Sequence, residues 1–518
     1  MGTRGYYVIR YRNMYFTSRH YSYGFPESLG LKVLQSIRQP NGIATYRQVF
    51  GEMLDGLTSP SHSLLLIENG DDFEPPSEQR PQRPIWIYEI DLDHNIFHIN
   101  GIPFFTLECL PDDEAFVQYA SEDRYGHTAC TSRCPPEHKY KKPAPPTIDI
   151  SGLATYRSLI CTGSQVALSD LLNISDILSQ REHVRVSLLE VMIGQCMFSS
   201  VICKEIHEIE FANDHNQFTN DQWSIACFMA SIVFVPQMFD HIRRVCHPEP
   251  KRKEFTWVRG DTVVCIATHL DNEQCLQASV SRLINAILEQ KDNPGYYFGI
   301  AFSVNHCAII KVVKDTHTIT FSHTNALQFL PSFYARSPST PGITALARLG
   351  YRIDPALFER VMEICNYKLR MPVRIQTEQS LAQGAADDDD HDVSPNTICP
   401  PLPLELWQEI ARYLPHFDLI TLGLVSNLCR EAALMLLRYP YLCGYRLVSP
   451  PKKIPKYLRG KKRLSMRAAS FSAVRAGFRS TVYIGVESED IPSKSMITPL
   501  RVKKFRLYVE FSRKRRYG

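Results

Sequence analysis

The sequence predicts an α+β fold with a mixed body of hairpins and helices, a small three-helix module, and a basic C-terminal region. Two patterns support this class: helical apolar spacing and consecutive hairpin-like strands occur in the same body, and the strands do not alternate regularly with helices. A third observation is size, because 518 residues with 44% hydrophobic and 22% charged residues suffice for two or three domains.

The N-terminal subdomain is expected over residues 1–120. Residues 5–24 alternate aromatic and β-branched side chains around Arg12 and Asn13, which predicts a β-hairpin. A turn rich in Asp and Asn at 91–95 predicts a second hairpin between two strands. The remaining predicted elements are helices over 28–37 and 44–54 and strands over 63–67, 85–92 and 96–99.

A Pro/Cys-rich loop over 121–148 is the predicted boundary that follows. It contains His127, Cys130, Cys134 and His138, four acceptable zinc ligands within 12 residues. The two pairs lack the long separation of a zinc finger, and Pro135-Pro136 stiffens the last part. A zinc site and an ordinary loop with free thiols both remain open.

The α+β body is expected over 149–378. Apolar spacing predicts long helices at 186–211 and 221–244, followed by alternating patterns that predict strands. These later elements are strands at 262–268, 296–304, 307–313 and 317–322 and helices at 273–290, 341–349 and 355–366. An acidic, proline-containing segment over 379–400 then predicts a solvated linker.

Three short helices are predicted over 401–445. Leu406, Ile410 and Leu414 recur at spacings of four, which places them on one helix face, and Pro415 ends that helix. Asp418 is a candidate cap for the second helix. A unit this short rarely buries so much apolar surface alone, so the surplus predicts a partner.

This pattern resembles the F-box, the module by which a substrate receptor docks on the Skp-type adaptor of a cullin ubiquitin ligase. The resemblance implies a set of adaptor-binding residues, with Arg430 at the rim: Leu402, Pro403, Leu406, Ile410, Leu414, Pro415, Leu419, Leu422, Val425 and Arg430. Cys429 stands where the family usually has Trp, and loss of that aromatic anchor would weaken the interface. The alternative is an ordinary helical hairpin packed on its own chain.

Residues 1–7 and 328–350 are similar to segments of uncharacterised fungal F-box proteins. This similarity does not imply any particular activity. The resemblance implies a non-catalytic substrate receptor with a Skp-type adaptor, a cullin and an unknown protein substrate as partners, and it implies no cofactor. Scattered cysteines and the lack of a secretory pattern or a membrane-spanning run predict a protein of the cytoplasm or nucleus.

A cysteine hydrolase is the enzymatic alternative. Cys196 precedes an apolar helical run and His306 lies between two strand-like runs, an order that superficially resembles papain-like peptidases. The orienting Asn or Asp has no recognisable setting, and Asp315 is only a candidate. Cys196 also falls inside a helical pattern, where a buried structural thiol is the commoner role.

The basic C-terminal region over 446–518 gives a third class of function. Residues 451–518 hold 19 Lys and Arg against 4 Asp and Glu, a net +15, so residues 1–450 carry −11. Aromatic residues such as Phe471, Phe478 and Tyr483 interleave with this charge, as in proteins that bind nucleic acid. An import signal at 513–516 and a solvated basic face are the alternatives.

Overall fold

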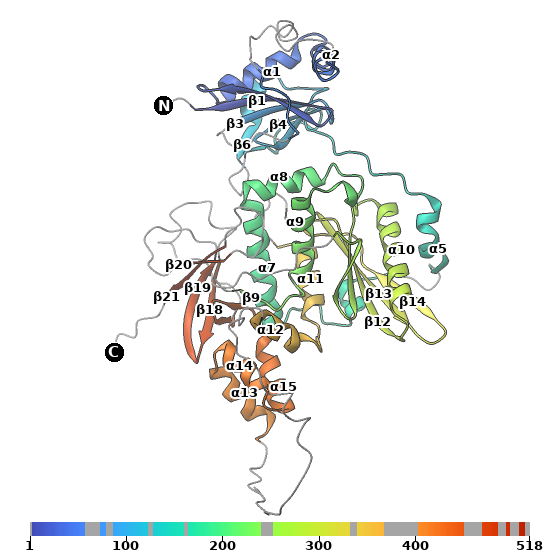
Figure 1. Ribbon diagram of the computed structural model, residues 1–518, viewed down its shortest axis with the longest axis vertical. Helices are drawn as coiled ribbons and strands as arrows, with labels where there is room; N and C mark the ends of the chain where they lie inside the picture. The colour runs from blue at the N-terminus through green and yellow to red at the C-terminus, as the bar shows by residue number, and fades with distance from the viewer. Residues whose placement is uncertain are drawn as a thin grey trace, which may run out of the picture. The chain divides into compact units, whose positions relative to one another are not determined.

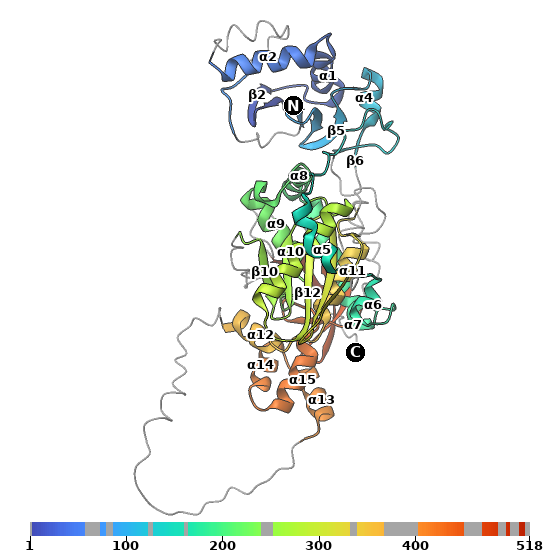
Figure 2. The ribbon, with the colours of Figure 1, turned by 90° about the vertical axis from the view of Figure 1, so that its right-hand side faces the viewer.

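A computed structural model describes residues 3–56, 73–78, 86–122, 128–159, 164–239, 252–331, 339–366, 402–449, 469–484, 494–497 and 507–512. The chain forms two compact units (Figures 1 and 2). One contains residues 1–146 and 197–218, and the other contains 147–196, 219–331 and 337–518. The predicted strand at 63–67, the linker at 379–400 and the run 513–516 lie outside the described residues.

The first unit is built on a five-stranded sheet in the order β2-β1-β3-β4-β5. Its strands are β1 (Gly5–Tyr11), β2 (Met14–His20), β3 (Trp86–Asp91), β4 (Ile96–Ile99) and β5 (Ile102–Thr106). β1 and β3 pair in parallel, whereas the other neighbours are antiparallel. Arg12 and Asn13 both have positive φ, which is the geometry of a tight hairpin turn. Both predicted N-terminal hairpins are therefore confirmed.

Helices close the core of the first unit. Side chains from α1 (Leu31–Arg38), α2 (Gly42–Leu54) and the sheet meet in one cluster, in which Tyr7, Phe16 and Phe50 are almost fully buried. The unit also contains the π-helix η1 (Pro26–Gly30), α4 (Asp113–Tyr119), β6 (Ala120–Glu122), β7 (Thr128–Cys130), α8 (Ser200–Ile209) and η4 (His215–Gln217).

The second unit contains a mixed sheet in the order β10-β11-β12-β13-β14-β8, with β15 paired to β13. Its strands are β8 (Ser164–Gln165), β10 (Phe255–Arg259), β11 (Thr262–Ile266), β12 (Gly295–Phe302), β13 (His306–Lys314), β14 (Ile319–His323) and β15 (Leu327–Gln328). The consecutive antiparallel pairs β12-β13 and β13-β14 confirm the predicted hairpins.

Helices cover both faces of this sheet. α10 (Glu273–Gln290) and α5 (Ala154–Leu159) lie on one face, and α9 (Asn220–Ser231) and α11 (Pro341–Tyr351) lie on the other (Figures 1 and 2). The remaining helices before the predicted linker are η3 (Ile150–Leu153), α6 (Leu168–Leu172), α7 (Gln180–Phe198) and α12 (Leu357–Asn366).

Two predicted helices are shorter than their apolar patterns. The run 186–211 is divided between α7 and α8, because Ser199 adopts an extended conformation and becomes the N-cap of α8. Serine favours helix caps over helix interiors. In the run 221–244, which the structure describes as far as Phe239, α9 ends at Ser231, and Pro236 follows, whose ring favours an extended residue before it.

Three further helices and a third sheet complete the second unit. The helices are α13 (Leu404–Tyr413), α14 (His416–Gly423) and α15 (Asn427–Leu437), as predicted, although Pro415 rather than Asp418 is the N-cap of α14. The sheet order is β20-β21-β19-β18-β17-β16-β9. Its strands are β9 (Met238–Phe239), β16 (Tyr441–Leu442), β17 (Tyr445–Leu447), β18 (Ala469–Arg475), β19 (Phe478–Ile484), β20 (Lys494–Ile497) and β21 (Leu507–Ser512).

Among the described residues, no single helix combines the length and apolar composition needed to cross a membrane. Only a bent pair, Gln180–Met197 with Val201–Ile209, meets both criteria when the two helices are taken together.

Candidate adaptor-binding surface

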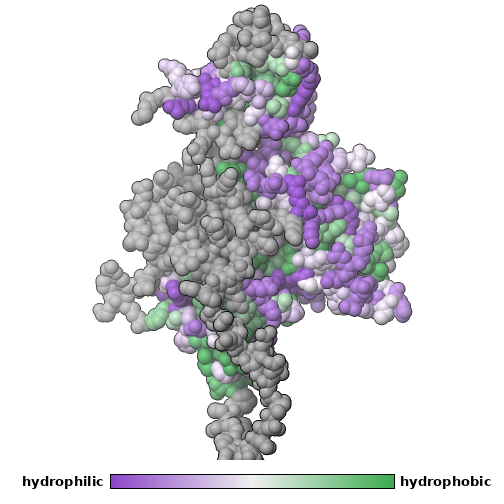
Figure 3. Space-filling view, viewed as in Figure 1, coloured by the Kyte–Doolittle hydropathy of each residue, from purple (hydrophilic) through white to green (hydrophobic). Residues whose placement is uncertain are grey.

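One face of α13 carries a row of exposed apolar side chains. Leu406 and Ile410 keep 48% and 41% of their surface exposed, and Tyr413 continues the row at the end of the helix. Leu402 precedes the helix and is also exposed. Figure 3 shows apolar atoms gathered over this part of the chain, where Figure 1 draws α13 and α14. An apolar row of this kind is typical of a surface that another protein covers.

The row continues onto α14 and the start of α15. Phe417 and Leu424 lie seven positions apart, so they share one face of the α14 segment. Val425 and Leu428 follow them and are exposed as well. We call the eight exposed side chains the apolar surface: Leu402, Leu406, Ile410, Tyr413, Phe417, Leu424, Val425 and Leu428. They make up half of the sixteen large exposed hydrophobic residues among the described residues, which marks this surface as unusual.

The opposite sides of these helices form a core of their own. Leu419 and Ala411 are fully buried, and they pack with Ala433 and Leu437 of α15. Ser426 caps α15 by accepting a hydrogen bond from the backbone N–H of Cys429 at 3.2 Å. The amide of Gln408 lies 2.9 Å from the sulfur of Met435, which ties α13 to α15. The apolar surface therefore rests on a packed support.

The same core extends into the body through α12. Phe358 is buried, and its ring lies so close to Gly423 that any Cβ at that position would overlap it. The guanidinium of Arg430 lies 5.1 Å from the centre of the Phe358 ring, and its Nε donates to the carbonyl of Gly423 at 3.3 Å. α14 and α15 are thus fixed to α12 within the second unit.

A second contact holds α13 from the side of the C-terminal sheet. The turn between β18 and β19 has positive φ at Ala476 and Gly477. A Cβ on Gly477 would lie 2.8 Å from the ring of Tyr413, so glycine allows the turn to approach α13 closely. The basic C-terminal region therefore contributes to the support of α13.

The structure separates the ten residues that the sequence grouped as adaptor contacts. Leu402, Pro403, Leu406, Ile410 and Val425 are exposed, whereas Leu414, Pro415 and Leu422 are half-buried. Leu414 and Leu422 pack against the core of the three helices. The separation follows from helix geometry, because one side of each helix faces outward and the other faces α12 and α15.

Three residues of this region contact other parts of their own chain. Leu419 has no exposed surface, so it belongs to the core that supports the apolar surface. Arg430 is half-buried and contacts Phe358 and Gly423 of its own chain, and its place at the rim of the adaptor interface stays a prediction. Cys429 is also fully buried, so a residue at this position affects the internal packing of the helices and is not an anchor on their surface.

Sequence reasoning missed Tyr413, Phe417, Leu424 and Leu428 as surface residues. Tyr413 lies seven positions after Leu406 and so continues the same helical face, which a longer window would have detected. Leu424 and Leu428 have apolar neighbours at helical spacing on both faces. Their exposure is decided by the position of α12, which the local pattern does not encode.

The proposed cysteine nucleophile does not have the expected setting. Cys196 lies near the C-terminal end of α7 instead of at a helix start, where the helix dipole would favour a thiolate. Its side chain is fully buried, and burial raises the pKa of the thiol far above its ordinary value. The thiol is therefore protonated at neutral pH. His306 begins β13 on the central sheet of the second unit.

The four candidate zinc ligands are only partly described. His127 lies outside the described residues. Burial raises the pKa of Cys130 to about 12 and also raises the pKa of Cys134. The neighbouring Cys134 raises the pKa of Cys130 further, whereas a hydrogen bond from Cys130 lowers the pKa of Cys134. His138 instead meets Cys109, with its Nδ1 2.9 Å from the carbonyl oxygen and 3.5 Å from the sulfur. The described part of this loop does not bring His138 together with the two thiols as a metal-binding group.

The aromatic residues of the basic region divide between core and surface. Phe471 is fully buried on β18 and Tyr483 is buried on β19, so neither is available to stack on a base. Phe478 is largely exposed at the start of β19. This arrangement gives the region a structural role in the third sheet.

Residues 400–441 match the family model of the F-box domain. The matched residues cover α13, α14 and α15, so the chain carries a C-terminal F-box domain within a fold of mixed helices and sheets. This domain supports binding to a Skp-type adaptor and, through it, to a cullin of an SCF-type ubiquitin ligase. No curated protein and no solved structure matches the chain.

Proposed function

We propose that this protein is a substrate receptor of a cullin-type ubiquitin ligase. The apolar surface of the F-box domain docks on the Skp-type adaptor, and the rest of the chain holds a protein substrate. The receptor contributes binding, while the cullin and its ubiquitin-conjugating partner supply the chemistry. The proposal also places the protein in the cytoplasm or the nucleus, where these ligases act.

The observation that carries the proposal is the exposure of Leu406 and Ile410 on a domain whose inner side is already packed. An unsatisfied apolar row at the end of a rigid support fits a protein partner, because covering it gains free energy without first ordering the helices. Tyr413 and Phe417 add the large rings that tend to dominate such interfaces.

The direct test is capture of a purified Skp-type adaptor by the full chain. Leu406→Asp with Ile410→Asp removes two apolar contacts and places two carboxylates where water is excluded. Half-burial of two such side chains accounts for roughly 2 kcal/mol, and desolvation of the new charges adds to it. We therefore expect affinity to fall by at least about 100-fold in calorimetry.

A matched control introduces two aspartates at exposed apolar positions outside the F-box domain. Ile353 and Ile177 are the most exposed isoleucines among the described residues, and both lie in the second unit outside the F-box domain. Ile353→Asp with Ile177→Asp should leave adaptor affinity unchanged. Equal binding by both double variants, with circular dichroism unchanged, would refute docking through this surface.

A further inference from the structure

A buried group of two carboxylates and one imidazole lies in the first unit, far in sequence from the F-box domain. Glu89 and Asp91 lie two residues apart on β3, so they share one face of the sheet, while Tyr88 and Ile90 enter the aromatic core on the other. His98 on β4 is the register partner of Glu89. Glu89 and Asp91 have no exposed surface and His98 is 1% exposed.

These three side chains can each offer a ligand atom to one ion. The carboxylate oxygens and the ring nitrogen all lie within 4.8 Å of one another. Three ligands at about 2.1 Å from a tetrahedral ion would be roughly 3.3–3.5 Å apart, so small side-chain rotations close the set. Two adjacent strands hold the three residues, and the antiparallel pairing fixes their order.

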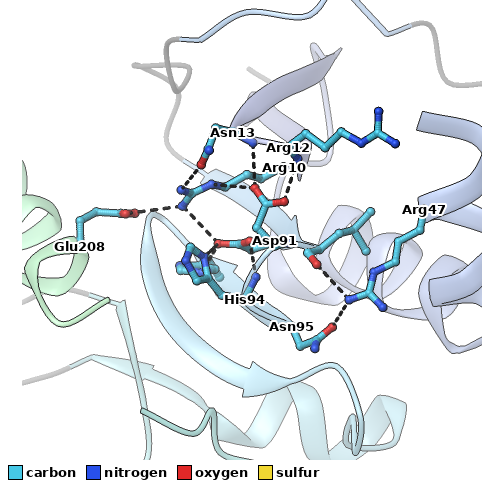
Figure 4. A network of polar contacts seen from close by, with 11 residues as sticks. Arg10, Arg12, Asn13, Arg47, Asp91, His94, Asn95 and Glu208 are labelled. Carbon is cyan, nitrogen blue, oxygen red and sulfur yellow. Dashed lines mark hydrogen bonds and ion pairs between the residues drawn. The ribbon is translucent and has the colours of Figure 1, made fainter. Parts of the chain in front are cut away.

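Asp91 shares its arginine partner with two other carboxylates. Arg10 is the cation of the network, with Nη1 3.3 Å from Asp91 and 3.5 Å from Glu208 and with Nε 3.5 Å from Asp93 (Figure 4). Among the described residues, three carboxylates, those of Asp91, Asp93 and Glu208, therefore face the guanidinium of Arg10. Buried charges of this kind are either paired or bound to a metal ion.

The carboxylate of Asp91 is fixed by several neighbours. Its Oδ1 accepts the backbone N–H groups of Asp93 and His94 at 3.0 Å, and its Oδ2 lies 2.8 Å from Nδ1 of His94. The carboxylate is therefore oriented by neighbours, as metal-binding carboxylates commonly are.

His98 supplies the second, independent observation. In the part of the chain that the structure describes, neither ring nitrogen of His98 has a hydrogen-bond partner. Its Nε2 points toward Asp91 Oδ2 at 3.6 Å, which is too long for a hydrogen bond but within reach of an ion pair if the ring is protonated. A buried imidazole without a hydrogen bond is costly unless a metal ion takes its lone pair.

We propose that Glu89, Asp91 and His98 bind one divalent first-row transition-metal ion such as Zn²⁺. Imidazole nitrogen and carboxylate oxygen together suit this class of ion. Arg10 and His94 then act as outer partners that orient Asp91. The ion joins β3 to β4 and strengthens the sheet of the first unit.

The experiment uses the full chain, stripped with a chelator and titrated with Co²⁺ as an optical probe. Co²⁺ bound by nitrogen and oxygen lacks the intense sulfur-to-metal absorption of thiolate sites, so the spectrum distinguishes this group from the cysteines of the chain. We expect one equivalent to bind with a nitrogen/oxygen spectrum and to raise the melting temperature. Absence of saturable binding, or a purely thiolate spectrum, would overturn the proposal.

Variants locate the ion. His98→Gln and Glu89→Gln should each lower Co²⁺ affinity by at least about tenfold, whereas Cys130→Ser with Cys134→Ser should leave the nitrogen/oxygen equivalent unchanged. Binding that persists at wild-type affinity in both His98→Gln and Glu89→Gln contradicts the assignment. Because the melting shift is measured on the wild-type chain, the proposal stays testable even if one variant fails to fold.

Discussion

Leu406 and Leu419 belong to the same short motif, yet replacing each by alanine should have opposite consequences. Leu419 is fully buried beneath α13 and α15, whereas Leu406 keeps 48% of its surface exposed. Leu419→Ala therefore removes core packing, and Leu406→Ala removes only a surface that the adaptor would cover. The pair separates the support of the F-box domain from its proposed contact surface.

The structure sets the size of both effects. Leu419→Ala should lower the free energy of unfolding by about 2–5 kcal/mol, the usual cost of a cavity at a fully buried leucine. Leu406→Ala should change it by less than about 0.5 kcal/mol. About half of the burial energy of a leucine remains available to a partner at Leu406, roughly 0.7–1.5 kcal/mol, which corresponds to a loss of adaptor affinity of about three- to twelvefold.

Two measurements on the full chain decide the matter. Urea unfolding with hydrogen exchange of peptides from 404–437 reports the stability of the three helices, and calorimetry with the purified adaptor reports affinity. We expect early exchange in Leu419→Ala and weaker binding in Leu406→Ala. Loss of stability in Leu406→Ala, or wild-type stability in Leu419→Ala, would refute the division between support and surface.

Two further predictions concern stability. Gly423→Ala should destabilise the second unit by about 1–3 kcal/mol, because the new methyl group overlaps the buried Phe358 ring. Urea unfolding measures this change, and a variant as stable as the wild type would contradict the close contact between Gly423 and the Phe358 ring. Burial lowers the pKa of His323, whose Nδ1 lies 2.9 Å from the Thr324 carbonyl and whose Nε2 lies 3.0 Å from the Tyr156 hydroxyl. The folded state therefore favours the neutral ring of His323. The stability that this ring contributes is fully present above its pKa in the unfolded chain, about 6.5, and is lost as the pH falls through its pKa in the folded chain. Unfolding free energies of wild type and His323→Gln should converge on acidification from pH about 8 to about 5, and a constant difference would contradict this.

The sequence was sufficient for elements whose signals are local. The hairpin at Arg12 and Asn13 was predictable because the alternating pattern on both sides ends at residues that tolerate positive φ. The predicted helix over 273–290 matches the bounds of α10, and in the structure Asn272 caps its first turn. Helices α7 and α9 were overextended because apolar spacing continues beyond Ser199 and Ser231, where caps and turns interrupt the backbone.

The site was predictable as a motif but not as a surface. Spacing placed Leu406 and Ile410 on one helix face, and the structure exposes both. Leu419 carries the same apolar character, and it is buried because α12 and α15 pack against α14. The pairing of β9 with β16 is likewise a tertiary contact between strands of only two residues each, too short for any periodic signal.

The short route from α15 to β16 has a consequence for target selection. α15 ends at Leu437, and Tyr441 already pairs with Met238, so no hinge-length segment intervenes on this side of the F-box domain. Under the proposed function, a substrate bound to the second unit would therefore have little freedom to move relative to the F-box domain. The orientation in which the substrate binds would then decide which of its lysines are modified. A substrate that binds tightly but has no lysine within reach of the ubiquitin donor would not be modified.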